Sequence, residues 1–170
     1  MKTIAIIAQK GGAGKTTVAV NLAVAAEAAG IKTALFDLDA QESATVWSDR
    51  REAKSPHVEF LTERRLPDAI KAAQHEGFAL CIIDTPPAAG PQALTAAEAA
   101  DLVLIPCRPS LVDLDAIRRT AQLVKSARPT ASTMKRQSRY PVGMRCSRRP
   151  TYQSLARSFH FMRMQAADPT

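Results

Sequence analysis

Residues 3–30 read TIAIIAQKGGAGKTTVAVNLAVAAEAAG, which is an apolar run, a glycine-rich loop and an alanine-rich stretch in succession. The isoleucine-rich run from Thr3 to Ala8 is typical of a buried strand. The stretch that ends at Gly30 is dominated by alanine and leucine and predicts a helix, with the glycine as its C-terminal stop. The loop therefore joins a strand to the N-terminus of a helix, where free backbone N–H groups and the helix dipole favour an anion.

The loop itself, QKGGAGKTT at residues 9–17, departs at one position from the phosphate-binding pattern G-x-x-x-x-G-K-[ST]. Gln9 stands where the pattern has its first glycine, and Lys10 adds a second lysine. The glycines let the backbone curl around phosphate oxygens. We expect Lys15 to reach the β and γ phosphates and Thr16 to bind Mg²⁺. The full predicted nucleotide-binding set is Gly11, Gly12, Ala13, Gly14, Lys15, Thr16 and Thr17.

Strand and helix patterns alternate along the next hundred residues. The predicted strands lie at 33–39, 57–62, 78–87 and 101–106, and the predicted helices at 66–77 and 111–127. This alternation predicts an α/β fold with a parallel sheet covered by helices on both faces. Ligands of such sheets bind at the carboxyl ends of the strands, which is where the loop, Asp37, Asp39 and Asp84 fall.

Two aspartates at strand ends are the predicted partners of the loop. Asp84 ends an apolar strand, and we expect it to hold Mg²⁺. Asp39 follows another strand, and we expect it to orient the attacking water toward the γ phosphate. The alternatives are that Asp84 only caps the turn after its strand and that Asp39 is solvated or caps a helix.

Four segments, in this order, resemble motifs of the ParA/MinD/nitrogenase-iron-protein ATPases. KGGAGKTT (10–17) resembles their deviant Walker A motif, and FDLDAQESATVW (36–47) their D-x-D-x-Q segment. IIDTPP (82–87) resembles their Walker B segment, and ADLVLIPCRPSLVDLDAI (100–117) the P-x-x-P-S-x-x-D stretch of plasmid-partition ATPases. The match is closest to short ParA proteins without an N-terminal helix-turn-helix domain. One departure is Ala40, where the family usually has proline.

The resemblance implies an enzyme that hydrolyses ATP with Mg²⁺ and works as an ATP-sandwich dimer. Lys10 matches the signature lysine of the family, which each subunit lends to the phosphates bound by the other, much as an arginine finger does. The implied catalytic residues are Lys10, Lys15 and Asp39. The alternative for Lys10 is an ordinary solvated lysine in a loop.

By the same resemblance, the dimer would bind DNA without sequence preference and act with a ParB-like centromere-binding protein in plasmid or chromosome segregation. Residues 1–128 contain few basic residues that are candidates for contacts with DNA phosphates. The alternative is that these residues only form a solvated helix face. They are Arg118, Arg119, Lys125 and Arg128. Because neither a signal peptide nor a membrane span is recognisable, the expected location is the cytoplasm, with association to the nucleoid in the ATP-bound state.

The composition changes close to Pro129. Residues 1–128 hold 15 Lys and Arg against 15 Asp and Glu, whereas residues 129–170 hold 8 against one, so the whole net charge of +7 lies in the second segment. The first segment contains 29 Ile, Leu and Val, and the second contains two. We therefore predict a ParA-like nucleotide-binding domain over 1–128 and a basic tail over 129–170 that lacks strand-like runs and is too polar to fold.

Three hypotheses account for this tail. The first is a frameshift after about codon 128, so that the usual C-terminal part is missing or replaced and the product lacks activity. The second is a basic, disordered arm that binds DNA. The third is an amphipathic helix over 152–164 that contacts a membrane, as in MinD-type relatives, although its apolar stripe of Leu155, Phe159 and Met162 is poor.

Overall fold

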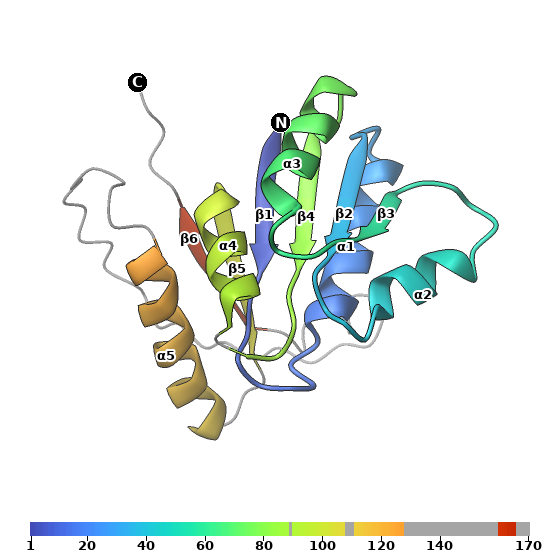
Figure 1. Ribbon diagram of the computed structural model, residues 1–170. Helices are drawn as coiled ribbons and strands as arrows, with labels where there is room; N and C mark the ends of the chain where they lie inside the picture. Colours follow the sequence, from blue (N-terminus) through green and yellow to red (C-terminus); the bar gives the residue numbers. More distant parts are fainter. Residues whose placement is uncertain (89, 108–110, 128–159, 166–170) are drawn as a thin grey trace.

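The computed structural model describes residues 1–88, 90–107, 111–127 and 160–165, which form one sheet with helices packed on it (Figure 1). The order of the strands across the sheet is β3-β2-β4-β1-β5-β6; the first five are parallel and β6 is antiparallel to β5. The elements along the chain are β1 (Lys2–Ile6), α1 (Lys15–Ala28), β2 (Thr33–Asp37), α2 (Ser43–Asp49), β3 (His57–Phe60), α3 (Leu66–His75), β4 (Leu80–Asp84), α4 (Pro91–Ala99), β5 (Leu102–Cys107), α5 (Leu111–Ala127) and β6 (His160–Gln165).

The register of the central strands aligns their carboxyl ends. Asp84 on β4 pairs with Ile6 on β1 and with Asp37 on β2, so these three residues form one row across the sheet. The chain leaves each of the three strands at this row. Three segments therefore begin side by side: the glycine-rich loop, the segment after Asp37 and the segment after Asp84. This is the edge at which parallel sheets bind their ligands.

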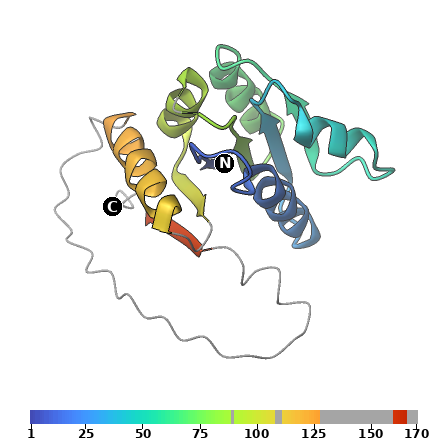
Figure 2. The ribbon, with the colours of Figure 1, turned by 90° about the horizontal axis from the view of Figure 1, so that it is seen from below.

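Alternation of side chains along the strands builds a core on each face of the sheet. On one face Ala5, Phe36 and Ile83 pack with apolar residues of α3, α4 and α5. On the other face Leu35 and Ile82 pack with residues of α1 and α2. Figure 2 shows α3 and α4 on one side of the sheet and α1 on the other. The predicted parallel sheet with helices on both faces is confirmed.

The sequence indicated a helix near Trp47 without bounds, which is α2, and it did not predict α4. Helix α2 has only 7 residues, too few to show a helical pattern. Helix α4 buries Ala93, Ala96 and Ala97 completely, at the spacing of a helix face. That spacing is present in the sequence. Because alanine is also common at exposed helix positions, however, the alanines did not distinguish a buried face from an exposed one, and no helix was predicted.

The prediction that residues 129–170 contain no strand is wrong for 160–165. These residues form β6 and pair with β5 from Leu102↔Gln165 to Cys107↔His160, so residues 160–164 are not part of the amphipathic helix that was one hypothesis for the tail. The prediction rested on the absence of apolar runs and of apolar–polar alternation in the tail. The outer edge of β5, however, offers unpaired backbone groups, and pairing with them depends little on the side-chain pattern of the added strand. The predicted boundary after residue 128, Arg128 itself and residues 152–159 lie outside the described part of the chain.

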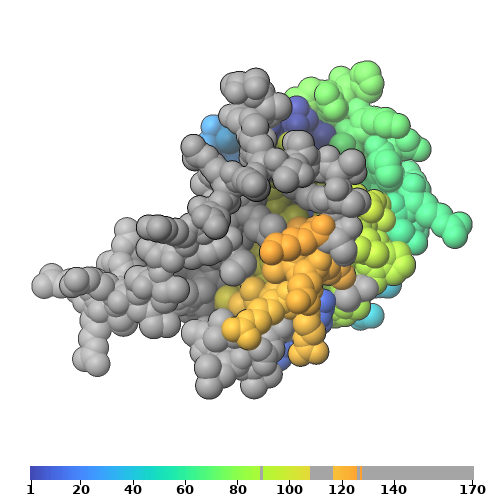
Figure 3. Space-filling view, turned by 90° about the vertical axis from the view of Figure 1, so that its left-hand side faces the viewer, coloured from blue at the N-terminus to red at the C-terminus, as the bar shows by residue number. Residues whose placement is uncertain are grey.

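The surface of α5 carries the basic residues expected to contact DNA. Arg118, Arg119 and Lys125 are exposed on this helix, the later part of which is orange in Figure 3. Of the described helices, none combines the length and apolar character needed to cross a bilayer.

Candidate functional site

The glycine-rich loop connects the end of β1 to the start of α1 and depends on two of its glycines for its shape. Gly12 has a φ of 68° and Gly14 a φ of 86°, in the left-handed region that side chains other than glycine rarely adopt. Gly11 has no positive φ, and a Cβ at this position would meet no atom within 4 Å. The predicted loop is therefore present, and its curvature comes from Gly12 and Gly14.

The N-terminus of α1 has no side-chain cap. Gly14 is its N-cap and supplies no side-chain hydrogen bond, and the first turn contains no acidic residue. The carbonyl of Gly14 accepts the first helical hydrogen bond, from the N–H of Val18 at 2.9 Å. The preceding N–H groups and the positive end of the helix dipole are thus suited to an anion.

Lys15 begins α1 and is only 7% exposed. Burial lowers the pKa of its ammonium group, while the nearby carboxylates of Asp84 and Asp39 act in the opposite direction. Taking a cation out of water costs free energy that nearby charges offset only in part unless they also form hydrogen bonds with it. The position is consistent with the predicted contact of Lys15 to phosphate oxygens, which would supply charged hydrogen-bond partners.

Asp84 ends β4 and is completely buried. Burial raises the pKa of its carboxyl group to about 7, although the Thr16 hydroxyl and the charge of Lys15 favour the ionised form. The Thr16 hydroxyl lies close to this carboxylate, but neither carboxylate oxygen receives a hydrogen bond of good geometry. Buried polar atoms are normally satisfied, so an orphaned carboxylate indicates a site for a cation. Oxygen atoms of one carboxylate and one hydroxyl, with the remaining positions left to water and phosphate, match what Mg²⁺ prefers.

The predicted pair of metal ligands, Thr16 and Asp84, is thus brought together, and the donor set fits Mg²⁺. No three His, Cys, Asp or Glu side chains gather in a way that could hold a metal ion anywhere in the described residues, this site included. A cavity of about 340 Å³ lies between α3 and β3, with Phe36, Arg64 and Phe78 among its lining residues. It contains none of the predicted site residues, so it is separate from the nucleotide site.

Asp39 is half-buried in the segment between β2 and α2 and interacts electrostatically with Lys15 and Asp84. One of its carboxylate oxygens accepts a hydrogen bond from the backbone N–H of Gln41 at 3.0 Å. Asp37, for which the sequence predicted no separate role, is completely buried and accepts hydrogen bonds from the N–H groups of Asp39 and Ala44. Its position at the buried end of a strand, two residues before Asp39, was the available signal.

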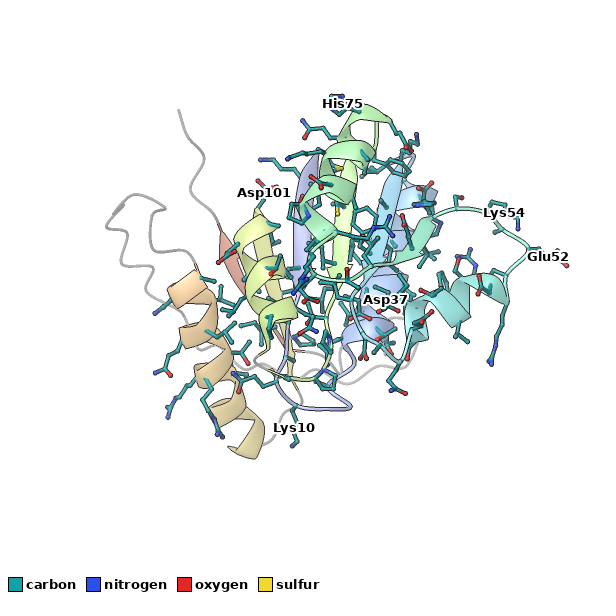
Figure 4. The ribbon with its side chains drawn as sticks, viewed as in Figure 1. Lys10, Asp37, Glu52, Lys54, His75 and Asp101 are labelled. Atoms are coloured by element: carbon teal, nitrogen blue, oxygen red, sulfur yellow. The ribbon has the colours of Figure 1, made fainter. Side chains whose placement is uncertain are left out.

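The other predicted loop residues lie further out. Lys10 is exposed at the tip of the loop, and Figure 4 shows its side chain pointing away from the sheet. Ala13 is buried and Thr17 is exposed. The structure therefore gathers Lys15, Thr16, Asp39 and Asp84 at one place and leaves Lys10 at the outer surface.

Comparison with known proteins agrees with this arrangement. The domain described as the CobQ/CobB/MinD/ParA nucleotide binding domain matches residues 4–146. The chain is 39% identical over 121 residues to the maintenance of carboxysome distribution protein A of Gloeobacter kilaueensis, covering 70% of this chain and 55% of that protein. It is 32% identical over 126 residues to protein ParA of Rhizobium radiobacter, covering 73% of this chain and 56% of that protein. The chain thus spans little more than half the length of these relatives.

Among solved structures, cobyrinic acid a,c-diamide synthase of Mycobacterium smegmatis with bound ADP and magnesium superimposes with a TM-score of 0.64 at 21% identity. The match covers 76% of this chain and 69% of that protein and concerns the fold. The domain match, which extends over most of the chain, and the sequence identities decide the family. The chain belongs to the CobQ/CobB/MinD/ParA nucleotide-binding family.

Proposed function

We propose that the chain binds ATP with Mg²⁺ at the glycine-rich loop and hydrolyses it to ADP and phosphate. The observation that carries this proposal is the orphaned, buried carboxylate of Asp84 beside Thr16 and the buried Lys15, at a helix N-terminus without a cap. Mg·ATP would supply a cation for the carboxylate and phosphate oxygens for the lysine and the helix terminus. The resemblance of the four motifs and the ADP and magnesium bound by the Mycobacterium protein support the same ligand.

Each residue has a distinct task in the proposed reaction. The backbone N–H groups from Gly11 to Thr17 hold phosphate oxygens, and Lys15 places its charge on the β and γ phosphates. Thr16 and Asp84 would hold the Mg²⁺, which would supply positive charge against the phosphates. Asp39 orients a water molecule for attack on the γ phosphate. Since phosphoryl transfer depends mainly on positioning and charge, this set is sufficient for slow hydrolysis.

A direct test of this function measures phosphate release by the purified chain with Mg·ATP and with ATP in excess EDTA. We expect turnover that requires Mg²⁺. Because the proposed dimer binds DNA, the assay is repeated with DNA present. Absence of phosphate release above the buffer rate in all conditions would contradict the proposed activity.

We further propose that Lys10 acts in the second subunit of an ATP-dependent dimer. Its exposed place at the tip of the loop, pointing away from its own sheet, suits a residue that reaches a neighbouring molecule. In that role it would stabilise charge that develops between the β and γ phosphates of the partner's ATP. ATP would then join the two subunits, and hydrolysis would release them.

Lys10→Ala is expected to bind Mg·ATP with nearly normal affinity but to remain monomeric. Hydrolysis should fall by about 10³-fold or more, as when an arginine finger is removed. Light scattering after size exclusion with Mg·ATP gives the mass, and a fluorescent ATP analogue gives the affinity. Lys54→Ala, which removes another exposed loop lysine, is the control. Normal dimerisation of Lys10→Ala would show that the trans role is wrong.

The biological role that we propose is the partition of a cargo by cycles of ATP-dependent dimerisation. In this proposal the dimer binds DNA non-specifically, associates with the nucleoid and is released when a ParB-like partner stimulates hydrolysis. The cargo is a plasmid, a chromosome or, as the name of the Gloeobacter relative suggests, a cellular body. A second possibility, a frameshifted product without activity, is favoured by the loss of apolar residues after residue 128.

A further inference from the structure

The segment between β2 and α2, residues 38–42, carries Asp39 and is held at both ends by the carboxylate of Asp37. The Oδ1 atom of Asp37 accepts a hydrogen bond from the backbone N–H of Asp39 at 2.9 Å. The Oδ2 atom accepts one from the N–H of Ala44 at 2.9 Å and a longer one from the N–H of Thr45 at 3.4 Å. One side chain therefore joins the start of the segment to the first turn of α2.

Asp37 is itself fixed by the sheet on both sides. Its carbonyl accepts a hydrogen bond from the N–H of Leu61 at 2.9 Å, and the N–H of the next residue, Leu38, donates to the carbonyl of Asp84 at 3.0 Å. The side chain is completely buried. Burial raises the pKa of its carboxyl group, and the three backbone N–H groups oppose this by favouring the ionised form. The Asp37 carboxylate, which accepts these hydrogen bonds, is therefore held in a fixed place in the sheet, in the same row as Asp84.

The segment adopts a conformation that requires such support. Glu42 has a φ of 50°, which is unfavourable for a residue with a side chain. The N–H of Glu42 donates to the carbonyl of Asp39 at 2.8 Å, and the N–H of Gln41 donates to the Asp39 carboxylate at 3.0 Å. Asp39 therefore lies in a tight turn that closes on itself and is anchored by Asp37 to the sheet.

We propose that Asp37 is a positioning residue that holds the Asp39 carboxylate at the nucleotide site. This inference rests on the proposed function, because it takes Asp39 to be the residue that orients the attacking water. A cap for α2 would need only the bonds to Ala44 and Thr45. The additional bond to the N–H of Asp39 is what assigns Asp37 a part in the reaction.

Asp37→Asn is the appropriate variant because it keeps the shape of the side chain while its amide group accepts hydrogen bonds at only one end. We expect kcat for ATP to fall by about tenfold or more and KM to change by less than about threefold, since the bonds lost are charge-assisted. Asp49→Asn removes the same charge from an exposed position at the other end of α2 and should leave both constants unchanged.

The combination with Asp39→Ala separates positioning from a structural role. If Asp37 acts through Asp39, the double variant should be no slower than Asp39→Ala alone. Wild-type kcat in Asp37→Asn, together with an inactive Asp39→Ala, would overturn this inference and leave the proposed function intact. An active Asp39→Ala would remove the catalytic role of Asp39 and this inference with it.

Amide hydrogen exchange, measured by NMR, tests the same contact without any reaction. In the nucleotide-free wild-type protein the N–H groups of Asp39 and Ala44 should exchange slowly, and in Asp37→Asn at least one of them about tenfold faster. The amides of β1 provide the internal reference. Exchange of both amides in the wild type at the rate of exposed loops would overturn the inference, whether or not the chain hydrolyses ATP. Unfolding of Asp37→Asn would not affect this wild-type measurement.

Discussion

Lys15→Ala is expected to weaken the binding of Mg·ATP strongly without lowering the stability of the ligand-free protein. Lys15 is buried at the first position of α1, where burial lowers the pKa of its ammonium group. The ligand-free fold therefore gains little from this charge, and alanine is a better helix former at the same position. Bound phosphates, in contrast, would lose charge-assisted hydrogen bonds of about 1.5–3 kcal/mol each, which lowers affinity at least about tenfold per bond.

A fluorescent ATP analogue titrated into the variant measures the affinity, and denaturant unfolding without nucleotide measures the stability. Lys71→Ala is the matched control, because this lysine is exposed on α3 and forms an ion pair with Asp68 at 3.5 Å on the surface. We expect both quantities to be unchanged in the control. Wild-type affinity of Lys15→Ala would show that the loop does not bind phosphate in the proposed way.

Asp84→Asn is expected to make the ligand-free protein more stable and to eliminate its response to Mg²⁺. The carboxylate is completely buried, and neither of its oxygens receives a hydrogen bond of good geometry. Replacing it by a neutral amide should raise the free energy of unfolding at pH 8 by about 1–4 kcal/mol, since each pKa unit between the folded and unfolded states corresponds to about 1.4 kcal/mol. A residue that costs stability in the absence of ligand is typical of a functional site.

The pH dependence of this difference follows from the raised pKa of Asp84. Burial raises its pKa from 3.8 to about 7, so the stabilisation from protonated Asp84 is fully present below pH 3.8 and is lost as the pH rises through 7. In EDTA, the variant should therefore exceed the wild type at pH 8 and lose most of that advantage at pH 5. Asp68→Asn, at an exposed position on α3, is the control. A variant less stable than the wild type at pH 8 would contradict this explanation.

The sequence contained enough information for the site's main elements because they lie at the ends of strongly apolar strands. The run before the loop and the run before Asp84 could only be buried strands, and parallel strands place their carboxyl ends together. The observed register, which aligns Ile6, Asp37 and Asp84, is the result of that rule. The glycines at 12 and 14 likewise indicated a tight turn, and both have positive φ.

The hydrogen bonds of Asp37, on which its proposed role rests, could not be predicted from the sequence in the same way. Its hydrogen-bond partners, the N–H groups of Asp39, Ala44 and Thr45, are backbone atoms, and every residue at these positions other than proline would offer the same donor. Only the turn between β2 and α2 brings them to one carboxylate. Strand β6 was not predicted for a related reason. It pairs with the open edge of β5 through backbone groups, and such pairing requires no particular side-chain pattern.

Thermal unfolding of the 170-residue chain, with and without Mg·ATP, tests the central claim most directly. A folded state that binds the nucleotide gains about 2.7 kcal/mol when the free ligand is at one hundred times Kd. We predict one cooperative transition that moves to higher temperature with Mg·ATP and moves less with ATP in EDTA. A chain that shows no cooperative transition, or a midpoint that Mg·ATP leaves unchanged, would contradict the claim that this chain folds and binds the nucleotide.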